Sequence, residues 1–386
     1  MLDVSQKVRG FTESVIREMT RLCRIHDAIN LAQGYPDFPA PDAVKEAARR
    51  AIAEDFNQYS ITWGSPSLRA AIAGKYERRY GMAVDPAREI TVTCGSTEAM
   101  IASILAVLDP GDELVVFEPF YENYVPDAIL AGVSPRFVRL KPPDWTFDAD
   151  ELAAAFNERT RGLVLNSPNN PTGKVFSRDE LTAIADLCRK WDVVVFSDEI
   201  YEHIVYDGAE HVPIATLPGM ADRTVTISAL SKTYSVTGWR VGWAIASPGL
   251  TAGIRKVHDF LTVAAPAPLQ EAGTVALALP DDYYVELAEG YRARRDLFVT
   301  GLADIGFECA APRGAYYVLA DAKGLGITDD AAFARRLAEE VRVGCVPGSS
   351  FYSEPERGRS IVRFSFCKRE ETLREALRRL EEGLAN

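Results

Sequence analysis

The sequence has few of the residues that build metal centres, and those present are not spaced as ligands. It contains four histidines and six cysteines in 386 residues, with no HExxH segment and no CxxC pair. Zinc sites in proteins usually draw on such closely spaced groups. We therefore expect no metal site, and we expect the cysteines to be reduced, as in a cytoplasmic protein.

Long apolar runs and an excess of positive charge are also missing. No segment approaches the roughly 20 apolar residues of a membrane-spanning helix, and the first residues lack the apolar core of a signal peptide. The formal net charge of −12 disfavours nucleic acid or a membrane surface as the main partner. No GxGxxG occurs, and Gly173-Lys174 lacks the flanking residues of a P-loop. The expected partners are therefore small molecules that bind without a GxGxxG motif or a P-loop.

What the sequence does contain, between residues 89 and 245, is an alternation of short apolar runs with amphipathic segments. This pattern predicts an α/β fold with a mostly parallel sheet sandwiched by helices. After a long helix expected at 282–302, further apolar runs predict a smaller α+β layer. The expected strands of the large sheet are 90–94, 114–117, 162–166, 193–197, 224–228 and 241–245. The expected strands of the small layer are 307–310, 316–319, 341–346 and 361–366.

One lysine lies where a charged side chain is costly. Lys232 falls in the small-residue loop between the expected strands 224–228 and 241–245, within the segment SKTYSVTGWRVG. An isolated lysine in a loop is most often a surface residue. Desolvation and a neighbouring cation such as Arg240, however, lower a lysine pKa and make the amine a nucleophile for Schiff-base chemistry.

Polar groups also follow the other expected strands. Ligands bind outside the carboxyl ends of strands in open parallel sheets. Gly95-Ser96-Thr97 starts a helix and is either an anion site or a plain N-cap. Asp198 at a strand end needs a cationic or N–H partner. That partner is either the pyridinium nitrogen of a bound ligand or a backbone N–H of the following turn, which Asp198 would then cap. Tyr121 either stacks on a flat ring or packs in the core.

Together and in this order, these motifs resemble the pyridoxal-phosphate (PLP) aminotransferases of the aspartate aminotransferase fold, over essentially the whole chain. The resemblance implies a homodimer in which amino acids and 2-oxo acids are the substrates. It also implies a small domain formed by both termini. The expected division is residues 1–45 for the N-terminal arm and part of the small domain, 46–287 for the large PLP-binding domain, and 288–386 for the small C-terminal domain.

The resemblance also assigns roles to individual residues. Lys232 is expected to anchor the cofactor and to act as the catalytic base, with Asp198 on the ring nitrogen and Tyr201 on the phenolic oxygen. Arg363 is expected to bind the substrate carboxylate, together with Gly34 and Asn170. The expected cofactor-binding residues are Gly95, Ser96, Thr97, Tyr121, Asn170, Asp198, Tyr201, Lys232 and Arg240, with Tyr59 reaching in from the second subunit.

The sequence departs from relatives at Ala229, where they commonly place a serine that binds the cofactor phosphate. Within the family, QGYPDFPAP, EPFYENY, KVHDFLT and GSSFY are most similar to the kynurenine, glutamine transaminase K and methionine aminotransferase branch. Thr97 stands where bacterial aspartate aminotransferases commonly carry a lysine, which disfavours a dicarboxylic substrate. The residues that either line a pocket for a flat or thioether side chain or pack in the core are Tyr35, Phe38, Trp63, Tyr121 and Phe351. An aspartate-type aminotransferase, a cysteine-conjugate β-lyase and a non-catalytic regulator stay open as alternatives.

Overall fold

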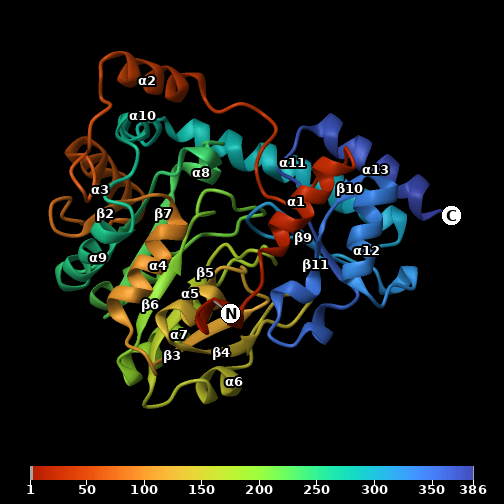
Figure 1. Cartoon of the computed structure of the whole chain (residues 1–386), viewed down its shortest axis with the longest axis horizontal. Coiled ribbons are helices and arrows are strands. Elements are labelled where there is room, and N and C mark those ends of the chain that lie inside the picture. The colour runs from red at the N-terminus through yellow and green to blue at the C-terminus, as the bar shows by residue number, and fades with distance from the viewer. Residues whose placement is uncertain (1–2, 386) are drawn as a thin grey trace.

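The core of the protein is a seven-stranded sheet. The structure, a computed structural model, describes residues 3–385. The strands are β2 (Ile90–Thr93), β3 (Glu113–Glu118), β4 (Ser134–Arg139), β5 (Thr160–Asn166), β6 (Val194–Asp198), β7 (Thr224–Ala229) and β8 (Gly242–Ile245). Their order is β2-β8-β7-β6-β5-β3-β4, with the strands from β7 to β4 parallel and β8 antiparallel to both of its neighbours (Figure 1). The predicted α/β fold with a mostly parallel sheet is confirmed.

Helices cover both faces of this sheet. They are α2 (Asp42–Ala53), α3 (Pro66–Tyr80), α4 (Ser96–Val107), α5 (Tyr124–Ala131), α6 (Ala149–Ala154), α7 (Arg178–Trp191), α9 (Pro248–Leu261) and α10 (Ala267–Ala276). Side chains alternate along a strand, so Leu114 and Val116 of β3 share one core with α4 and α5. Val115 and Phe117 of the same strand share the opposite core with α6 and α7. Burial on both faces explains why the strands are apolar without a gap.

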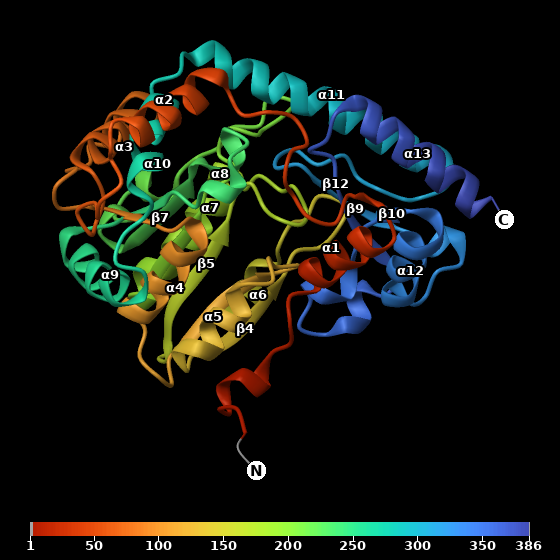
Figure 2. The same cartoon turned by 45° about the horizontal axis from the view of Figure 1, so that its top comes forward.

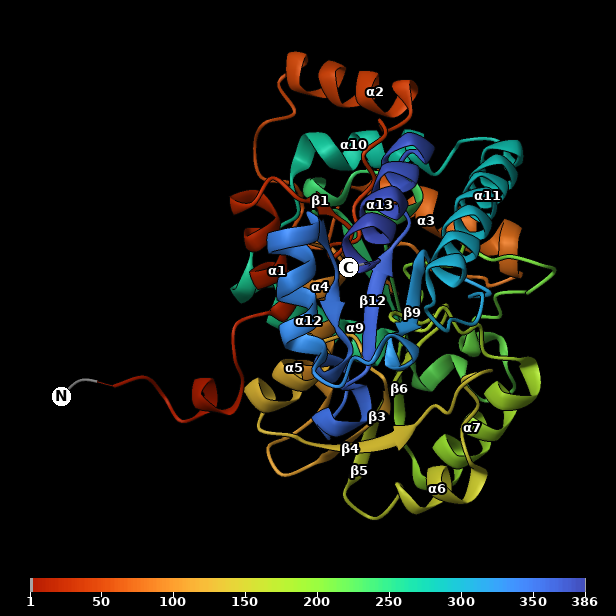
Figure 3. The ribbon, with the colours of Figure 1, turned by 90° about the vertical axis from the view of Figure 1, so that its right-hand side faces the viewer.

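A smaller layer lies beside the large sheet. It contains α1 (Val15–Ile25), β1 (Ile29–Asn30), α11 (Asp281–Ile305), β9 (Tyr317–Asp321), α12 (Asp330–Arg336), β10 (Val343–Gly344), β11 (Val346–Pro347), β12 (Ile361–Ser365) and α13 (Glu370–Leu384). The antiparallel sheet has the order β11-β12-β9, and β1 pairs with β10. Figure 2 shows α11 running from the large sheet to this layer, with α13 beside it. The N-terminal segment projects away from the body (Figure 3).

Two expected strands of the small layer need correction. The strand expected at 307–310 does not form, and Glu308 makes only an isolated bridge with Asp321. Phe307 is buried there while Ala310 is exposed, so the apolar residues of this segment do not share one buried face. The strand expected at 341–346 is divided into β10 and β11. The left-handed Arg342, with φ +64°, lies just before β10.

The described part of the chain bears on the other expectations as well. No helix within residues 3–385 is long and apolar enough to cross a membrane. The same residues contain no cluster of three or more His, Cys, Asp or Glu side chains that could hold a metal ion. All six cysteines are free thiols.

Candidate functional site

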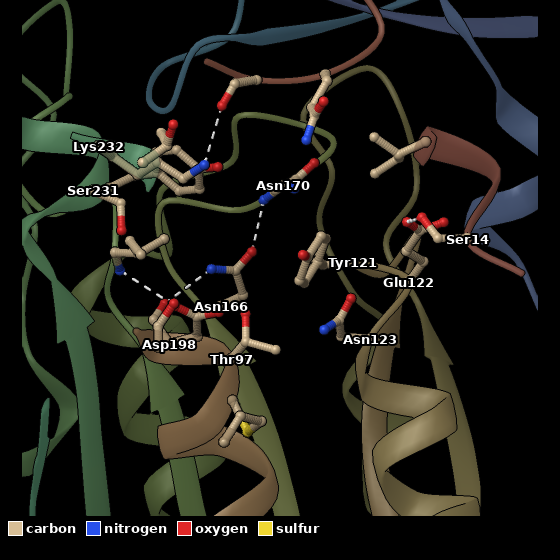
Figure 4. Close-up of a pocket in the computed structure, with 18 of the residues that line it drawn as sticks. Ser14, Thr97, Tyr121, Glu122, Asn123, Asn166, Asn170, Asp198, Ser231 and Lys232 are labelled. Atoms are coloured by element: carbon tan, nitrogen blue, oxygen red, sulfur yellow. Dashed lines mark hydrogen bonds between the residues drawn. The ribbon is translucent and has the colours of Figure 1, made fainter. Parts of the chain in front are cut away.

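A cavity of about 450 Å³ opens where the parallel strands end, between the large sheet and the small layer. The carboxyl ends of β5 and β6 supply Asn166 and Asp198, and the turn after β7 supplies Lys232. The small layer contributes Tyr317 and Arg363 from β9 and β12. Figure 4 shows Lys232 and Asp198 on one side of this cavity and Ser14 with Glu122 on the other. Side chains from distant parts of the sequence therefore meet at one place.

Asp198 is a carboxyl group whose hydrogen-bond donors are both neutral. It is 7 % exposed at the end of β6. The Tyr124 hydroxyl donates to its Oδ2 at 2.8 Å, and the Ile200 N–H donates to Oδ1 at 3.3 Å. Burial raises the pKa of Asp198 to about 6. A carboxylate held in this way is suited to a cationic partner in the cavity.

Lys232 lies in the short helix α8 (Leu230–Thr233) that follows β7. Its Nζ donates to the Gly34 carbonyl at 3.2 Å. Burial, with a smaller contribution from the cations Arg240 and Arg363, lowers its pKa to about 8. Part of the amine is therefore neutral near physiological pH, as a nucleophile or a base requires.

Arg240 and the start of α4 together form an anion cradle. No side chain caps the first turn of α4, and Ser96 and Thr97 line the cavity there beside Arg240. Gly95 has φ +82°, and a Cβ at this position would overlap the Arg240 guanidinium. Free amides at a helix N-terminus beside an arginine favour a phosphate.

The neighbours of Ala229 differ in where they point. Ser228 donates to Glu202 at 2.9 Å, and both residues are buried away from the cavity. Ser231 lines the cavity next to Lys232 (Figure 4). Of these two serines, Ser231 is therefore the one that lines the cavity.

Arg363 is fully buried, with its guanidinium held by neutral acceptors. Nη1 donates to Asn170 Oδ1 at 2.8 Å and Nη2 donates to the Ala32 carbonyl at 2.5 Å, whereas Nε has no partner within residues 3–385. The ring centroids of Tyr317 and Phe351 lie 4.3 and 5.0 Å from the Arg363 Cζ. Such a desolvated, uncompensated cation favours a carboxylate in the cavity.

Two tyrosines complete the inner wall. The hydroxyl of Tyr201 lies 3.0 Å from that of Tyr317, and burial raises the pKa of Tyr201 well above its ordinary value. Tyr201 is therefore a neutral hydroxyl that can donate. The ring of Tyr121 lies edge-on to Tyr124 at 5.7 Å and faces the cavity (Figure 4).

The structure brings most of the predicted site residues together. Gly95 adjoins the cavity through its contact with Arg240. Tyr59 does not reach the cavity: its side chain is 88 % exposed and borders a separate hollow near Phe56 and Ile61. The predicted residues that line the cavity are Gly34, Ser96, Thr97, Tyr121, Asn170, Asp198, Tyr201, Lys232, Arg240 and Arg363.

Of the aromatic residues expected either to line a pocket or to pack in the core, only some line the cavity. Tyr35 and Tyr121 line the cavity, and Phe351 instead packs against the buried guanidinium described above. Phe38 packs into the core of the small layer. Trp63 lies outside the cavity beneath an arginine of α9. Aromatic composition alone does not distinguish these packing roles from a place in the cavity.

Several residues that line the cavity were not predicted from the sequence. Asn166 supports the site from β5, donating to the Asp198 carbonyl and accepting from the Asn170 N–H. Asp127 of α5 is 7 % exposed, its Oδ2 has no partner in the described chain, and burial raises its pKa to about 7. At the outer end, α1 adds Ser14, Ile16 and Arg17. The helical pattern of α1 gives no signal that its first turn faces a cavity.

Comparisons with known proteins place the chain among enzymes. The family model described as aminotransferase class I and II matches residues 26–380. A Mycobacterium tuberculosis protein described as probable N-succinyldiaminopimelate aminotransferase DapC is 42% identical, with 97% of each chain covered. Human kynurenine–oxoglutarate transaminase 1 is 37% identical, with 92% of each covered. The solved structure of Escherichia coli YbdL, described as having a methionine aminotransferase function, matches with a TM-score of 0.94 at 36% identity, and the match covers 99% of this chain and 100% of that one.

Proposed function

Because the chain belongs to the class I and II aminotransferases, we propose that it moves an amino group from an aromatic or neutral L-amino acid to a 2-oxo acid by a ping-pong mechanism. It is a PLP-dependent aminotransferase of the aspartate aminotransferase fold. The observation that carries the proposal is the meeting of Lys232, Asp198 and Arg363 around one cavity.

The residues present fit this cofactor. Lys232 offers an amine of lowered pKa, and Asp198 offers a buried carboxylate whose hydrogen-bond donors are both neutral. Arg240 and the uncapped start of α4 supply an anion cradle. Lys232 would hold the aldehyde carbon, Asp198 the pyridine nitrogen and Arg240 the phosphate.

The chain's own groups account for binding and proton transfer. PLP supplies, when bound, an electron-withdrawing ring that stabilises negative charge at the substrate α-carbon. The neutral form of Lys232 Nζ would take the proton from that carbon. Asp198 would keep the ring nitrogen protonated.

Other groups orient the reactants. Arg363 binds the substrate α-carboxylate through its fork, next to the Gly34 loop. Because Asn170 Oδ1 accepts from Arg363, its amide nitrogen is left to donate to the phenolic oxygen of the cofactor. The Tyr201 hydroxyl donates to the same oxygen. Tyr121 stacks on the ring.

The preference for neutral donors rests on the charge of the inner cavity. Thr97, at the start of α4, offers no cation to a second carboxylate, and a carboxylate left unpaired in a desolvated site costs several kcal/mol. Tyr35 and Tyr121 present aromatic surface instead. The relatives include kynurenine and methionine aminotransferases, which supports the same substrate class.

We expect phenylalanine, methionine, glutamine or kynurenine to exceed aspartate as amino donor by at least about tenfold in kcat/KM, which corresponds to roughly 1.4 kcal/mol of transition-state binding. Steady-state kinetics of all five donors with one 2-oxo acid acceptor measures this ratio. Aspartate as the best donor contradicts the proposal.

The same assay separates the other readings. Pyruvate and ammonia released from a cysteine conjugate faster than transamination favour the β-lyase reading. A chain that binds PLP and turns over none of these donors favours a regulator.

We further propose that the protein is a homodimer in which Tyr59 completes the partner's phosphate site. Aminotransferases of this fold are typically dimeric. The near-complete exposure of Tyr59 on a surface with Phe56 and Ile61 supports a covering partner.

We expect light scattering to give twice the chain mass, and we expect Tyr59→Phe to weaken PLP binding several-fold without changing that mass, since one charge-assisted hydrogen bond is lost. An active monomer contradicts the dimer, and unchanged PLP affinity contradicts the role of Tyr59. We also propose the division into residues 1–45, 46–287 and 288–386 as functional units, supported by the pairing of β1 with β10.

A further inference from the structure

The outer end of the cavity holds charged groups that the proposed reaction does not use. Lys232 and Asp198 lie at the inner end, and Ser14 and Glu122 lie across the cavity from them (Figure 4). Lys232, Arg363, Ser14 and Arg17 line one continuous cavity, so the side chain of a substrate held by Lys232 and Arg363 has room to extend toward this outer end. The groups found there therefore bear on substrate choice.

The first turn of α1 is held in place at this end. The Ser14 hydroxyl accepts from the Arg17 N–H at 3.3 Å as the N-cap, and it also donates to the Glu122 carboxylate. This double contact ties α1 to the segment after β3. Because residues three apart share one side of a helix, Arg17 extends on the same side as Ser14.

Arg17 is a cation at the rim of the cavity that makes no direct ion pair. It lines the cavity with an exposed side chain, and its guanidinium makes no hydrogen bond or ion pair with residues 3–385. Its charge acts on Glu13, but the Glu13 carboxylate is paired with Arg21, one turn further along α1, at 2.8 Å. Glu122, an acid of the cavity lining, accepts from Ser14. The Arg17 guanidinium therefore has donors available for a carboxylate in the cavity.

Resting on the proposed function, we propose that Arg17 is a specificity-determining residue that binds a second, distal carboxylate of a substrate long enough to reach from Lys232 to α1. That carboxylate belongs either to a dicarboxylic 2-oxo acid acceptor or to a long acidic donor. Aspartate, with its short side chain, keeps its carboxylate near the inner end and does not benefit. A single enzyme thereby combines neutral donors with an acidic acceptor.

The test uses pairs of ligands that differ only in charge. Glutamate and glutamine are nearly isosteric donors, and 2-oxoglutarate and its terminal amide are the matching acceptors. In the Arg17→Gln variant we expect kcat/KM for the acidic member to fall roughly tenfold, mainly through KM, with the amide member within about twofold. Arg17→Lys, which keeps the charge, should recover part of the loss. Arg21→Gln is the matched control on the same helix and should change neither member.

A binding measurement provides a readout that is independent of turnover. Calorimetry of the PLP-loaded enzyme with glutarate and with its monoamide should show that Arg17→Gln weakens glutarate about tenfold and leaves the monoamide unchanged. The donor pair and the acceptor pair together tell which substrate carries the distal carboxylate.

The assignment of Arg17 is overturned if the acid-to-amide ratios are the same in the wild type and in Arg17→Gln. This applies to kcat/KM for the donor pair and the acceptor pair and to the affinity for glutarate and its monoamide. Failure of the proposed function gives a different result, because it is seen in the wild-type enzyme. There, either aspartate is the best donor or no transamination occurs. An acid-to-amide ratio that falls equally in Arg21→Gln also overturns the assignment, since it reports the general charge of α1.

Discussion

Lys232→Ala is expected to reduce transamination by at least about 10⁴-fold, because one side chain supplies both the anchor for the cofactor and the base at the substrate α-carbon. The amine is placed by α8 and by its bond to the Gly34 carbonyl, and no other lysine lines the cavity among the described residues. Borohydride reduction followed by mass spectrometry should place PLP on residue 232 in the wild type and nowhere in the variant.

The pKa of Lys232 gives this prediction a pH dependence. Burial lowers that pKa to about 8, so the neutral amine is scarce well below pH 8 and predominates above it. The rate at which the PLP-free chain takes up cofactor should therefore rise with pH through about 8 and then level off.

The control is Lys256→Ala, which removes an exposed lysine of α9 and should leave both uptake and turnover unchanged. Lys232→Arg keeps a positive charge but should not form the adduct. A Lys232→Ala enzyme that transaminates at the native rate ends the assignment.

Much of the large sheet could be predicted because its local signals agree. The amphipathic pattern of residues 178–191 predicts a helix, which is observed as α7 and begins with a Ser177–Glu180 capping box. The strand expected at 193–197 is observed as β6, shifted by one residue, with Asp198 at its end. Where the hydrophobic period, the cap and the strand length indicate the same element, that element can be predicted from the sequence without knowledge of its tertiary contacts.

Other elements could not be predicted because their signals are weak or mixed. The edge strand β4 carries Arg136 and Arg139 and is mostly part-exposed, so its sequence does not read as a buried strand. The helix α5 was missed, and with it Tyr124, which donates to Asp198. Arg17 was missed for another reason: it lies on an amphipathic helix, and only the tertiary placement of that helix puts it at the cavity.

The candidate site shows the same division between local and tertiary signals. Residues that follow strands, such as Asp198 and Lys232, could be placed from topology, since parallel strands end at one edge. Tyr59 could not be placed, because its expected contact lies on another chain. The serine near Ala229 was left open by the sequence, and only the direction of Ser231 into the cavity favours it over Ser228.

Asp198→Asn is expected to lower kcat by about 10³-fold while the protein stays folded. Asparagine has nearly the same shape: its amide oxygen can accept from the Ile200 N–H, and its NH2 group can then donate to the Tyr124 hydroxyl oxygen. What is lost is the negative charge that keeps the ring nitrogen protonated, and an unprotonated ring withdraws electrons poorly. Turnover should therefore fall far more than affinity for the cofactor, which is held by Lys232 and the phosphate cradle.

Two further measurements separate this charge effect from a structural one. Tyr124→Phe removes one hydrogen bond to the carboxylate and leaves its charge, so it should cost only about tenfold in kcat. Thermal unfolding of the PLP-free chains should show that Asp198→Asn does not lower Tm, since burial raises the pKa of this carboxyl to about 6 and its ionised form opposes folding at neutral pH. If the asparagine variant keeps more than a tenth of the wild-type kcat, Asp198 does not hold the ring nitrogen. If Asp198→Asn and Tyr124→Phe lose activity equally, the hydrogen bond between the two side chains, and not the charge, is what the reaction needs.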